Sequence, residues 1–144
     1  MTTRNEVGSV LPSFSAALLE AIIESAPVAM ILSDEHRGIH LVNREAEALF
    51  GYSRDELIGQ QIEMLLPSLS QAAHVNVRRS FFAKPVARRM GSGRELFGAR
   101  KDGAKVPIEI ALTPIDSGEG LFVLSVVIDI TERKRLEEDV RRAH

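Results

Sequence analysis

The chain has 144 residues, no Cys and a formal net charge of −2. A chain of this length suits one domain with a single hydrophobic core, and the missing Cys excludes disulfides and thiolate metal sites. No apolar run reaches the ~18 residues that a membrane span requires, and the N-terminus lacks the layout of a signal peptide. These features predict a cytoplasmic module that stands alone or is one piece of a longer protein.

The charge is unevenly distributed along the chain. Residues 64–105 carry nine basic and two acidic side chains, whereas residues 1–63 carry four basic and ten acidic ones. Such a basic segment can attract an anionic ligand or nucleic acid. No nucleic-acid motif and no interleaved aromatic residues accompany it, so a solvated surface is the favoured interpretation and no nucleic-acid partner is expected.

The N-terminal part predicts a flanking helix and a β-hairpin. Residues 1–12 show no pattern and are expected to form a flexible lead. Apolar residues then recur at helical spacing within residues 13–26, and Pro27 ends that helix. Residues 28–33 and 39–42 predict two strands joined by a turn. The helix has one apolar stripe, which can pack on its own domain or on a second copy of the chain.

Two short capped helices are expected next. Asn43 is a suitable N-cap for the first, and Gly51 can close it in a left-handed conformation. Ser53 opens the second, with Glu56 at the spacing of a capping box, and Gly59 ends it. Helices this short are not stable alone, so they must lie against the rest of the domain.

The remaining elements predict an α+β fold. Residues 62–66 predict one helical turn, and residues 71–82 predict a longer helix. Three strands follow at residues 94–100, 106–113 and 121–128. The middle strand alternates apolar and polar residues, as a half-buried strand does. The last strand is apolar on nearly every residue and must be covered on both faces. The element order predicts a five-stranded antiparallel sheet with short helices on one face.

Three motifs resemble those of PAS domains, which are small sensory modules. They are the capped-helix run Asn43–Gly59, the turn Arg100–Gly103 followed by Val106–Ile110, and the exit segment Asp129–Lys134. Their order and spacing are similar to the family pattern over about residues 25–134. The resemblance implies a PAS core at residues 27–129 and the start of a coiled-coil signalling helix at residues 130–144.

The PAS resemblance implies a sensory and dimerisation module of a signalling protein rather than an enzyme. The absent output domain would be a histidine kinase of a two-component system or a cyclic-dinucleotide enzyme. The signal would pass from the last strand through Asp129, Ile130 and Thr131, with Asp129 as a hinge contact or as an ordinary helix cap. The flanking helix and the last strand would bury each other in a homodimer. A ligand-free dimerisation module is the alternative function.

A PAS pocket for a small-molecule ligand would be lined by apolar residues from several elements. The candidates are Met30, Leu41, Phe50, Leu65, Phe81, Phe82, Phe97, Ile110 and Val126. A packed core needs the same residues, so the sequence leaves open whether a ligand or side chains fill that space.

His74 and Arg94 form a candidate cofactor site. Their spacing is similar to that in haem-binding PAS domains of the oxygen-sensor kinase type, which implies His74 as the iron ligand and Arg94 as the residue that steadies bound oxygen. PAS domains of the non-haem type show a similar His and the same run from Gly91 to Gly98. His74 could therefore be a surface residue, and Arg94 could pair with a carboxylate. The lack of Cys excludes flavin-adduct and thioester-linked photochemistry, and no metal-ligand spacing is present.

Overall fold

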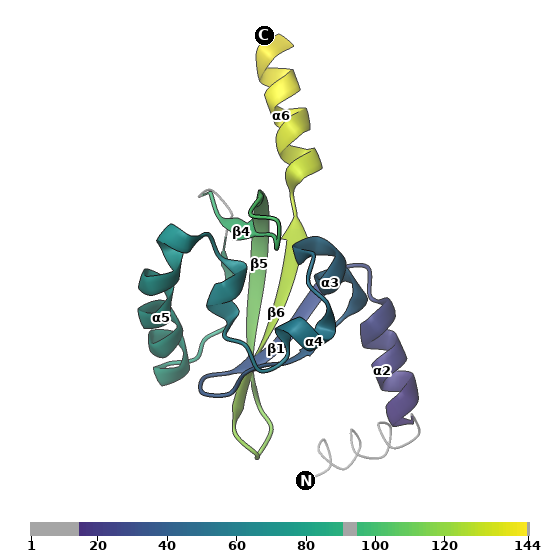
Figure 1. Cartoon of the computed structure of the whole chain (residues 1–144), viewed down its shortest axis with the longest axis vertical. Coiled ribbons are helices and arrows are strands. Elements are labelled where there is room, and N and C mark those ends of the chain that lie inside the picture. The colour runs from purple at the N-terminus through teal and green to yellow at the C-terminus, as the bar shows by residue number, and fades with distance from the viewer. Residues whose placement is uncertain (1–14, 91–94, 144) are drawn as a thin grey trace.

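The computed structural model describes residues 15–90 and 95–143, so the predicted lead at residues 1–12 lies outside the described residues. They form one antiparallel sheet with helices packed on one face, and a terminal helix that leaves the body (Figure 1). This is the predicted α+β architecture. Within the described residues, no helix is long and apolar enough to span a bilayer.

The sheet has five positions that are filled by six strands of the described chain. These are β1 (Ala29–Asp34), β2 (Gly38–Val42), β3 (Arg88–Met90), β4 (Phe97–Ala99), β5 (Lys105–Asp116) and β6 (Leu121–Asp129). The order is β2-β1-β6-β5-β3, with β4 also paired to β5. The strands β3 and β4 pair with successive parts of β5, so together they occupy the fifth position.

The sequence predicted one strand at residues 94–100 for that position and missed β3. Two of the three residues of β3, Arg88 and Arg89, are charged and exposed. A short edge strand of this kind lacks the apolar alternation that marks a half-buried strand.

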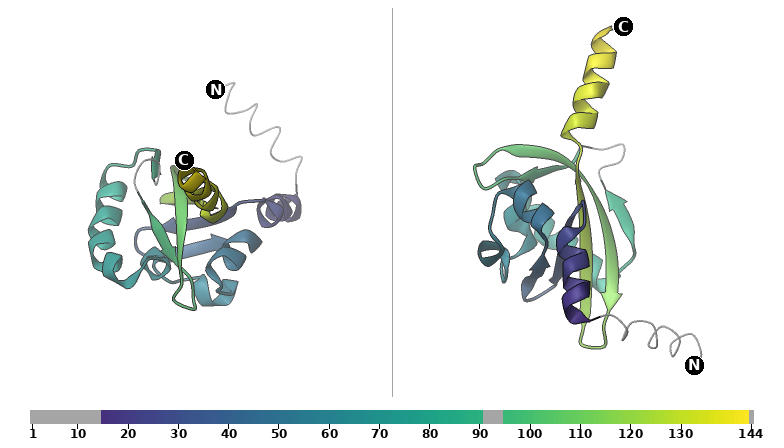
Figure 2. Two further views of the ribbon diagram at one scale, coloured as in Figure 1. Left: turned by 90° about the horizontal axis from the view of Figure 1, so that it is seen from above. Right: turned by 90° about the vertical axis from the view of Figure 1, so that its right-hand side faces the viewer.

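The helices lie mainly over one face of the sheet. They are α2 (Ala16–Ser25), α3 (Arg44–Phe50), α4 (Arg54–Leu57), the 3₁₀ turn η2 (Ile62–Leu65), α5 (Ser68–Ala83) and α6 (Thr131–Ala143). Figure 2 shows α3, α4 and α5 on the same side of the sheet and α6 pointing away from it. The predicted caps are confirmed: Asn43 caps α3, Gly51 closes it at φ 80°, and Ser53 and Glu56 form a capping box on α4.

The core lies between the inner, helix-covered face of the sheet and these helices. Buried residues of β1, β2, β5 and β6 meet Phe50, Leu57 and Leu65 there. The outer face of β6 is only partly covered, and Ile128 is exposed on it. The flanking helix α2 packs beside α3 instead of over β6, and it buries none of its residues fully. The expected cover on both faces of β6 is therefore not provided by the described part of one chain.

The side chain of Asn43 joins three elements of the fold. Its Oδ1 accepts hydrogen bonds from the backbone N of Met30 at 2.9 Å and of Ala46 at 3.1 Å. Its Nδ2 donates to the backbone O of Ile23 at 3.0 Å and of Val28 at 2.9 Å. Asn43 is 0% exposed, so its amide bonds to the protein and not to water. One amide thus links the end of α2, the start of β1 and the first turn of α3.

We expect Asn43→Ala to lower the free energy of unfolding by about 2–4 kcal/mol, because it removes a helix cap and leaves buried backbone groups unpaired. Asn76→Ala, at an exposed position of α5, is the matched control and should change stability by no more than about 0.5 kcal/mol. Urea unfolding followed by circular dichroism measures both. A loss below about 1 kcal/mol for Asn43→Ala would contradict this role.

Candidate functional site

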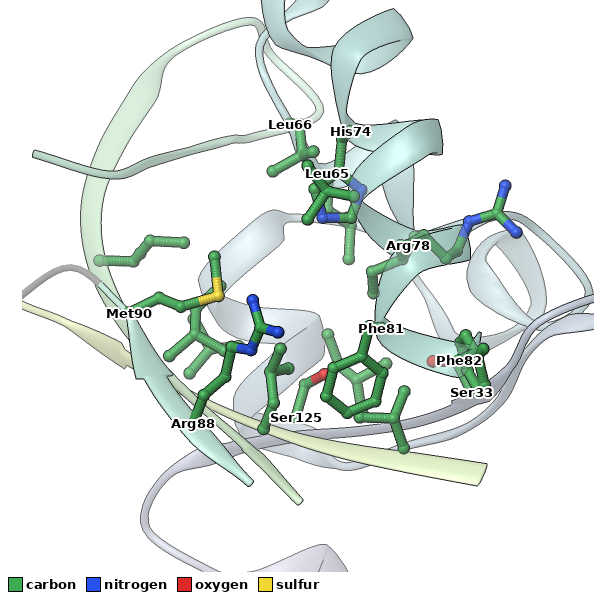
Figure 3. Close-up of a pocket in the computed structure, with 18 of the residues that line it drawn as sticks. Ser33, Leu65, Leu66, His74, Arg78, Phe81, Phe82, Arg88, Met90 and Ser125 are labelled. Carbon is green, nitrogen blue, oxygen red and sulfur yellow. The ribbon is translucent and has the colours of Figure 1, made fainter. Parts of the chain in front are cut away.

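A cavity lies between α5 and the inner face of the sheet (Figure 3). Its volume is about 80 Å³, well below the ~300–1,000 Å³ of pockets for drug-sized molecules. Each water-sized position needs roughly 10–15 Å³, so the space suits a molecule of about five to eight non-hydrogen atoms. The lining is largely apolar, and polar atoms come from Ser33, His74, Arg78, Arg88 and Ser125.

The structure brings together part of the predicted pocket. The predicted residues Phe50, Leu65, Phe81, Phe82 and Ile110 line the cavity. The predicted residues Met30, Leu41, Phe97 and Val126 do not. In β1 and β6 the inward positions belong to Ile31 and Val127, so the neighbouring residues Met30 and Val126 take the outer face.

Leu41 and Phe97 lie in other parts of the molecule. Leu41, on β2, faces α2 across a separate surface groove. Phe97, on β4, has the ammonium of Lys105 at 5.8 Å from its ring centroid. The sequence analysis in turn missed Ser33, Ser125 and Arg88. The two serines carried a usable signal, because each is a polar residue in an otherwise apolar stretch of strand.

A buried carboxylate anchors α5 above the cavity. Glu63, on η2, is 7% exposed. The Nδ1 of His74 donates to Oε2 of Glu63 at 2.6 Å, and Nε of Arg78 donates to the same oxygen at 3.1 Å. His74 and Arg78 are four residues apart and so lie on one face of α5. Arg78 also donates to the backbone O of Glu35 at 2.6 Å, which ties α5 to the β1–β2 turn.

These contacts keep Glu63 ionised. Burial alone would raise the pKa of Glu63, but hydrogen bonds from Arg78 and His74, together with their charges, outweigh it and hold the pKa below its usual value. The carboxylate accepts from Nδ1 of His74, so the second ring nitrogen, Nε2, remains for another partner.

His74 is half-buried and lines the cavity, whereas its predicted companion Arg94 lies outside the described residues. The donor chemistry of His74 suits a haem iron, since metal-binding His residues commonly donate their other N–H to a carboxylate. The cavity is too small for a haem as it stands. No cluster of three or more metal-ligating side chains occurs in residues 15–90 and 95–143.

The predicted signalling residues meet at the junction of β6 and α6. Oδ1 of Asp129 accepts from the backbone N of Thr131 at 2.8 Å, which satisfies an amide at the start of the helix. The side chain of Ile130 is buried, and its backbone N donates to the backbone O of Pro107 on β5 at 3.0 Å. The first residues of the exit are therefore attached to β5 as well as to β6.

A family model described as the PAS fold matches residues 17–130. The chain belongs to the PAS family. Among curated proteins, the sensor protein FixL of Bradyrhizobium diazoefficiens is 31% identical to it over 119 residues, which are 83% of this chain and 24% of FixL. The cell-division control histidine kinase PdhS of Brucella ovis is 31% identical over 125 residues, 87% of this chain and 12% of PdhS. The chain thus spans a small part of either relative.

Solved PAS domains have the same fold. The PAS domain of an HTR-like protein from Haloarcula marismortui superposes with a TM-score of 0.66 at 23% identity, covering 80% of this chain and 96% of that one. This likeness confirms the predicted PAS architecture. A PAS domain of this kind is a sensory module and not itself a catalyst.

We expect Glu63→Gln to lower the free energy of unfolding by about 1–3 kcal/mol at neutral pH, because Arg78 and His74 lose their ionised partner. The pKa of Glu63 is lower in the folded than in the unfolded chain, so its stabilisation is present above the unfolded pKa of ~4.3 and is lost as the pH falls through the folded pKa. The gap between wild type and variant should therefore shrink below about pH 4. Urea unfolding across pH 3–7 measures it.

Glu138→Gln, on the exposed surface of α6, is the matched control and should show a small and nearly constant difference. If the difference in unfolding free energy between wild type and Glu63→Gln stays the same from pH 7 to pH 3, the ionised network is contradicted.

Proposed function

We propose that this PAS domain binds a small molecule in the cavity beneath α5 and passes the resulting change to α6, which leads to an output domain in the parent protein. The observation that carries the proposal is the position of β6. Its residues Val123, Ser125 and Val127 line the cavity, and the exit begins at its last residue, Asp129. A ligand and the exit helix therefore contact the same strand.

The contacts of α6 suggest how the change would travel. Arg133 and Lys134, in its first turn, form ion pairs with Glu109 and Glu95. Glu109 is on β5, which also lines the cavity through Ile108. A ligand that favours one relative position of β5 and β6 would favour one orientation of α6. It can do so only by its difference in affinity for the two positions.

The relatives support a histidine kinase as the output domain. FixL is named a sensor protein and PdhS a histidine kinase, and both are aligned over most of this chain. A cyclic-dinucleotide enzyme is the other output to consider. The proposal places the module in the cytoplasm, on the same side as such an output.

Exposed apolar residues support a homodimer as the working form. Leu18, Leu19 and Ile22 are exposed on α2, and Ile128 is exposed on the outer face of β6. Leu136 and Val140 of α6, four residues apart, are exposed too and could form the seam of a two-helix coiled coil. A second copy would cover these surfaces, and a dimer without any ligand is the simpler alternative function.

We expect Asp129→Ala to loosen the start of α6, because the amide of Thr131 loses its acceptor, at a cost of about 1 kcal/mol. Amide hydrogen exchange at residues 130–134 should rise about fivefold, and the response of the parent protein's output to its stimulus should change. Asp139→Ala, farther along α6, is the matched control. Unaltered exchange together with unaltered basal and stimulated output would count against this hinge.

Haem is a second candidate ligand, favoured by the orientation of His74. When bound, haem would supply an iron that takes up a gas molecule, and His74 would hold it through Nε2 while Glu63 fixes the ring. Binding requires α5 to move away from the sheet, so we place this candidate after the small ligand.

The haem candidate predicts a Soret band in the chain purified from haem-supplemented cells. His74→Ala should abolish the band, and His36→Ala, at an exposed turn, should leave it intact. A wild-type chain without a Soret band would exclude haem.

A further inference from the structure

Two serine hydroxyls face the cavity without a partner. Ser33 is 4% exposed and Ser125 is 5% exposed, and both line the cavity. Neither hydroxyl forms a hydrogen bond within the described residues. Both hydroxyls reach the open space of the cavity. Within the described residues, the one side-chain atom that is fully enclosed and has no hydrogen-bond partner is Oε1 of Gln61. A hydroxyl that is open to the cavity and has no partner in the protein is free to hydrogen-bond a polar ligand atom, so these two positions are suited to such a ligand.

One cation at the cavity is also available. Arg78 is occupied by Glu63, but Arg88 has no carboxylate within ion-pair distance among the described residues. Its guanidinium lies 5.6 Å from the ring centroid of Phe81. Figure 3 shows the side chain of Arg88 extending from β3 into the cavity, towards the space above Ser125.

Strand register places Arg88 and Ser125 in one row across the sheet. Arg88 pairs with Leu112, and Leu112 pairs with Ser125. Neighbouring strands are about 4.8 Å apart, so the two Cα atoms are separated by roughly 10 Å, which a long arginine side chain and a ligand group can span. The direct partner of Ser125 on β1 is Ile31, so Ser33 lies diagonally from Ser125.

The geometry points to a small carboxylate with a short aliphatic chain as the ligand of this cavity, an inference that rests on the proposed sensory function. The carboxylate accepts hydrogen bonds from Arg88, Ser125 and Ser33. Diagonal residues on paired strands are about 7–8 Å apart, a distance that a carboxylate bridges with hydrogen bonds of about 2.7 Å. The guanidinium supplies the matching charge and a two-pronged donor. The aliphatic chain fills the apolar remainder of the cavity, whose size suits pentanoate.

Calorimetric titration of the whole chain with pentanoate tests this inference, with 1-pentanol as the uncharged analogue. We expect pentanoate to bind and 1-pentanol to bind at least about tenfold more weakly, because a hydrogen bond to a charged group is the stronger one. Arg88→Gln should weaken the binding of pentanoate by about 10- to 100-fold. Arg89→Gln is the matched control, because adjacent strand residues point to opposite faces and Arg89 does not line the cavity.

The serines give a second readout that separates binding from folding. Ser33→Ala and Ser125→Ala should each weaken the binding of pentanoate by about five- to tenfold. The ligand-free chain should keep its melting temperature or gain some, because no hydrogen bond within the described residues is lost and alanine matches the apolar lining of the cavity. If alanine lowers both binding and stability, the serines are structural and the inference is wrong.

The outcomes distinguish this inference from the proposed function. Equal binding of pentanoate and 1-pentanol, no binding of pentanoate, or full binding by Arg88→Gln each overturns the carboxylate assignment. The sensory function would survive those results, since an uncharged molecule could occupy the same cavity. Conversely, specific pentanoate binding with an unresponsive α6 would support the ligand class and contradict signal transmission.

Discussion

The fold depends on the buried amide of Asn43, which satisfies four backbone groups at the place where three elements meet. Two donors and two acceptors on a planar side chain match two carbonyls and two amides, which no carboxylate or hydroxyl can do. Through the amide of Met30, this contact sets the position of β1. The inward residues Ile31 and Ser33 form part of the cavity floor, so the site inherits its geometry from a contact outside it.

The helix α5, which covers the cavity, is held in place differently from the strands on the opposite side of the cavity. Only Phe81 of α5 is fully buried, and residues such as Leu69 and Val77 are exposed. The helix is instead attached by Glu63, which binds His74 and Arg78 at its middle. A helix with so little apolar burial and only a few polar contacts opens at lower cost than the sheet beneath it. The proposed ligand would therefore enter by displacing α5 while the strands beneath it keep their register.

Local signals in the sequence were enough for the fold, and they were weaker for the site. Asn43, Gly51, Ser53 and Glu56 specify caps by chemistry that acts within a few residues, and the structure has those caps. In β6, apolar residues occupy both faces, so periodicity could not show that Val127 and not Val126 points inward. The partnership of Glu63 with α5 joins residues on either side of Pro67, which precedes the helix. No pattern of period two or 3.6 reports such a contact.

The proposed route from the cavity to the exit is short, and strand pairing would make it effective. The strands β5 and β6 pair continuously from Ile108 with Asp129 to Asp116 with Leu121. Such a ladder resists local distortion, so in the proposed function a ligand in contact with its middle would tilt this two-stranded ribbon as a unit. The end of the ribbon carries the bond from Ile130 to Pro107, and the first turn of α6 follows at once. A small tilt within the ladder would therefore be enlarged along a helix that has few other contacts to restrain it.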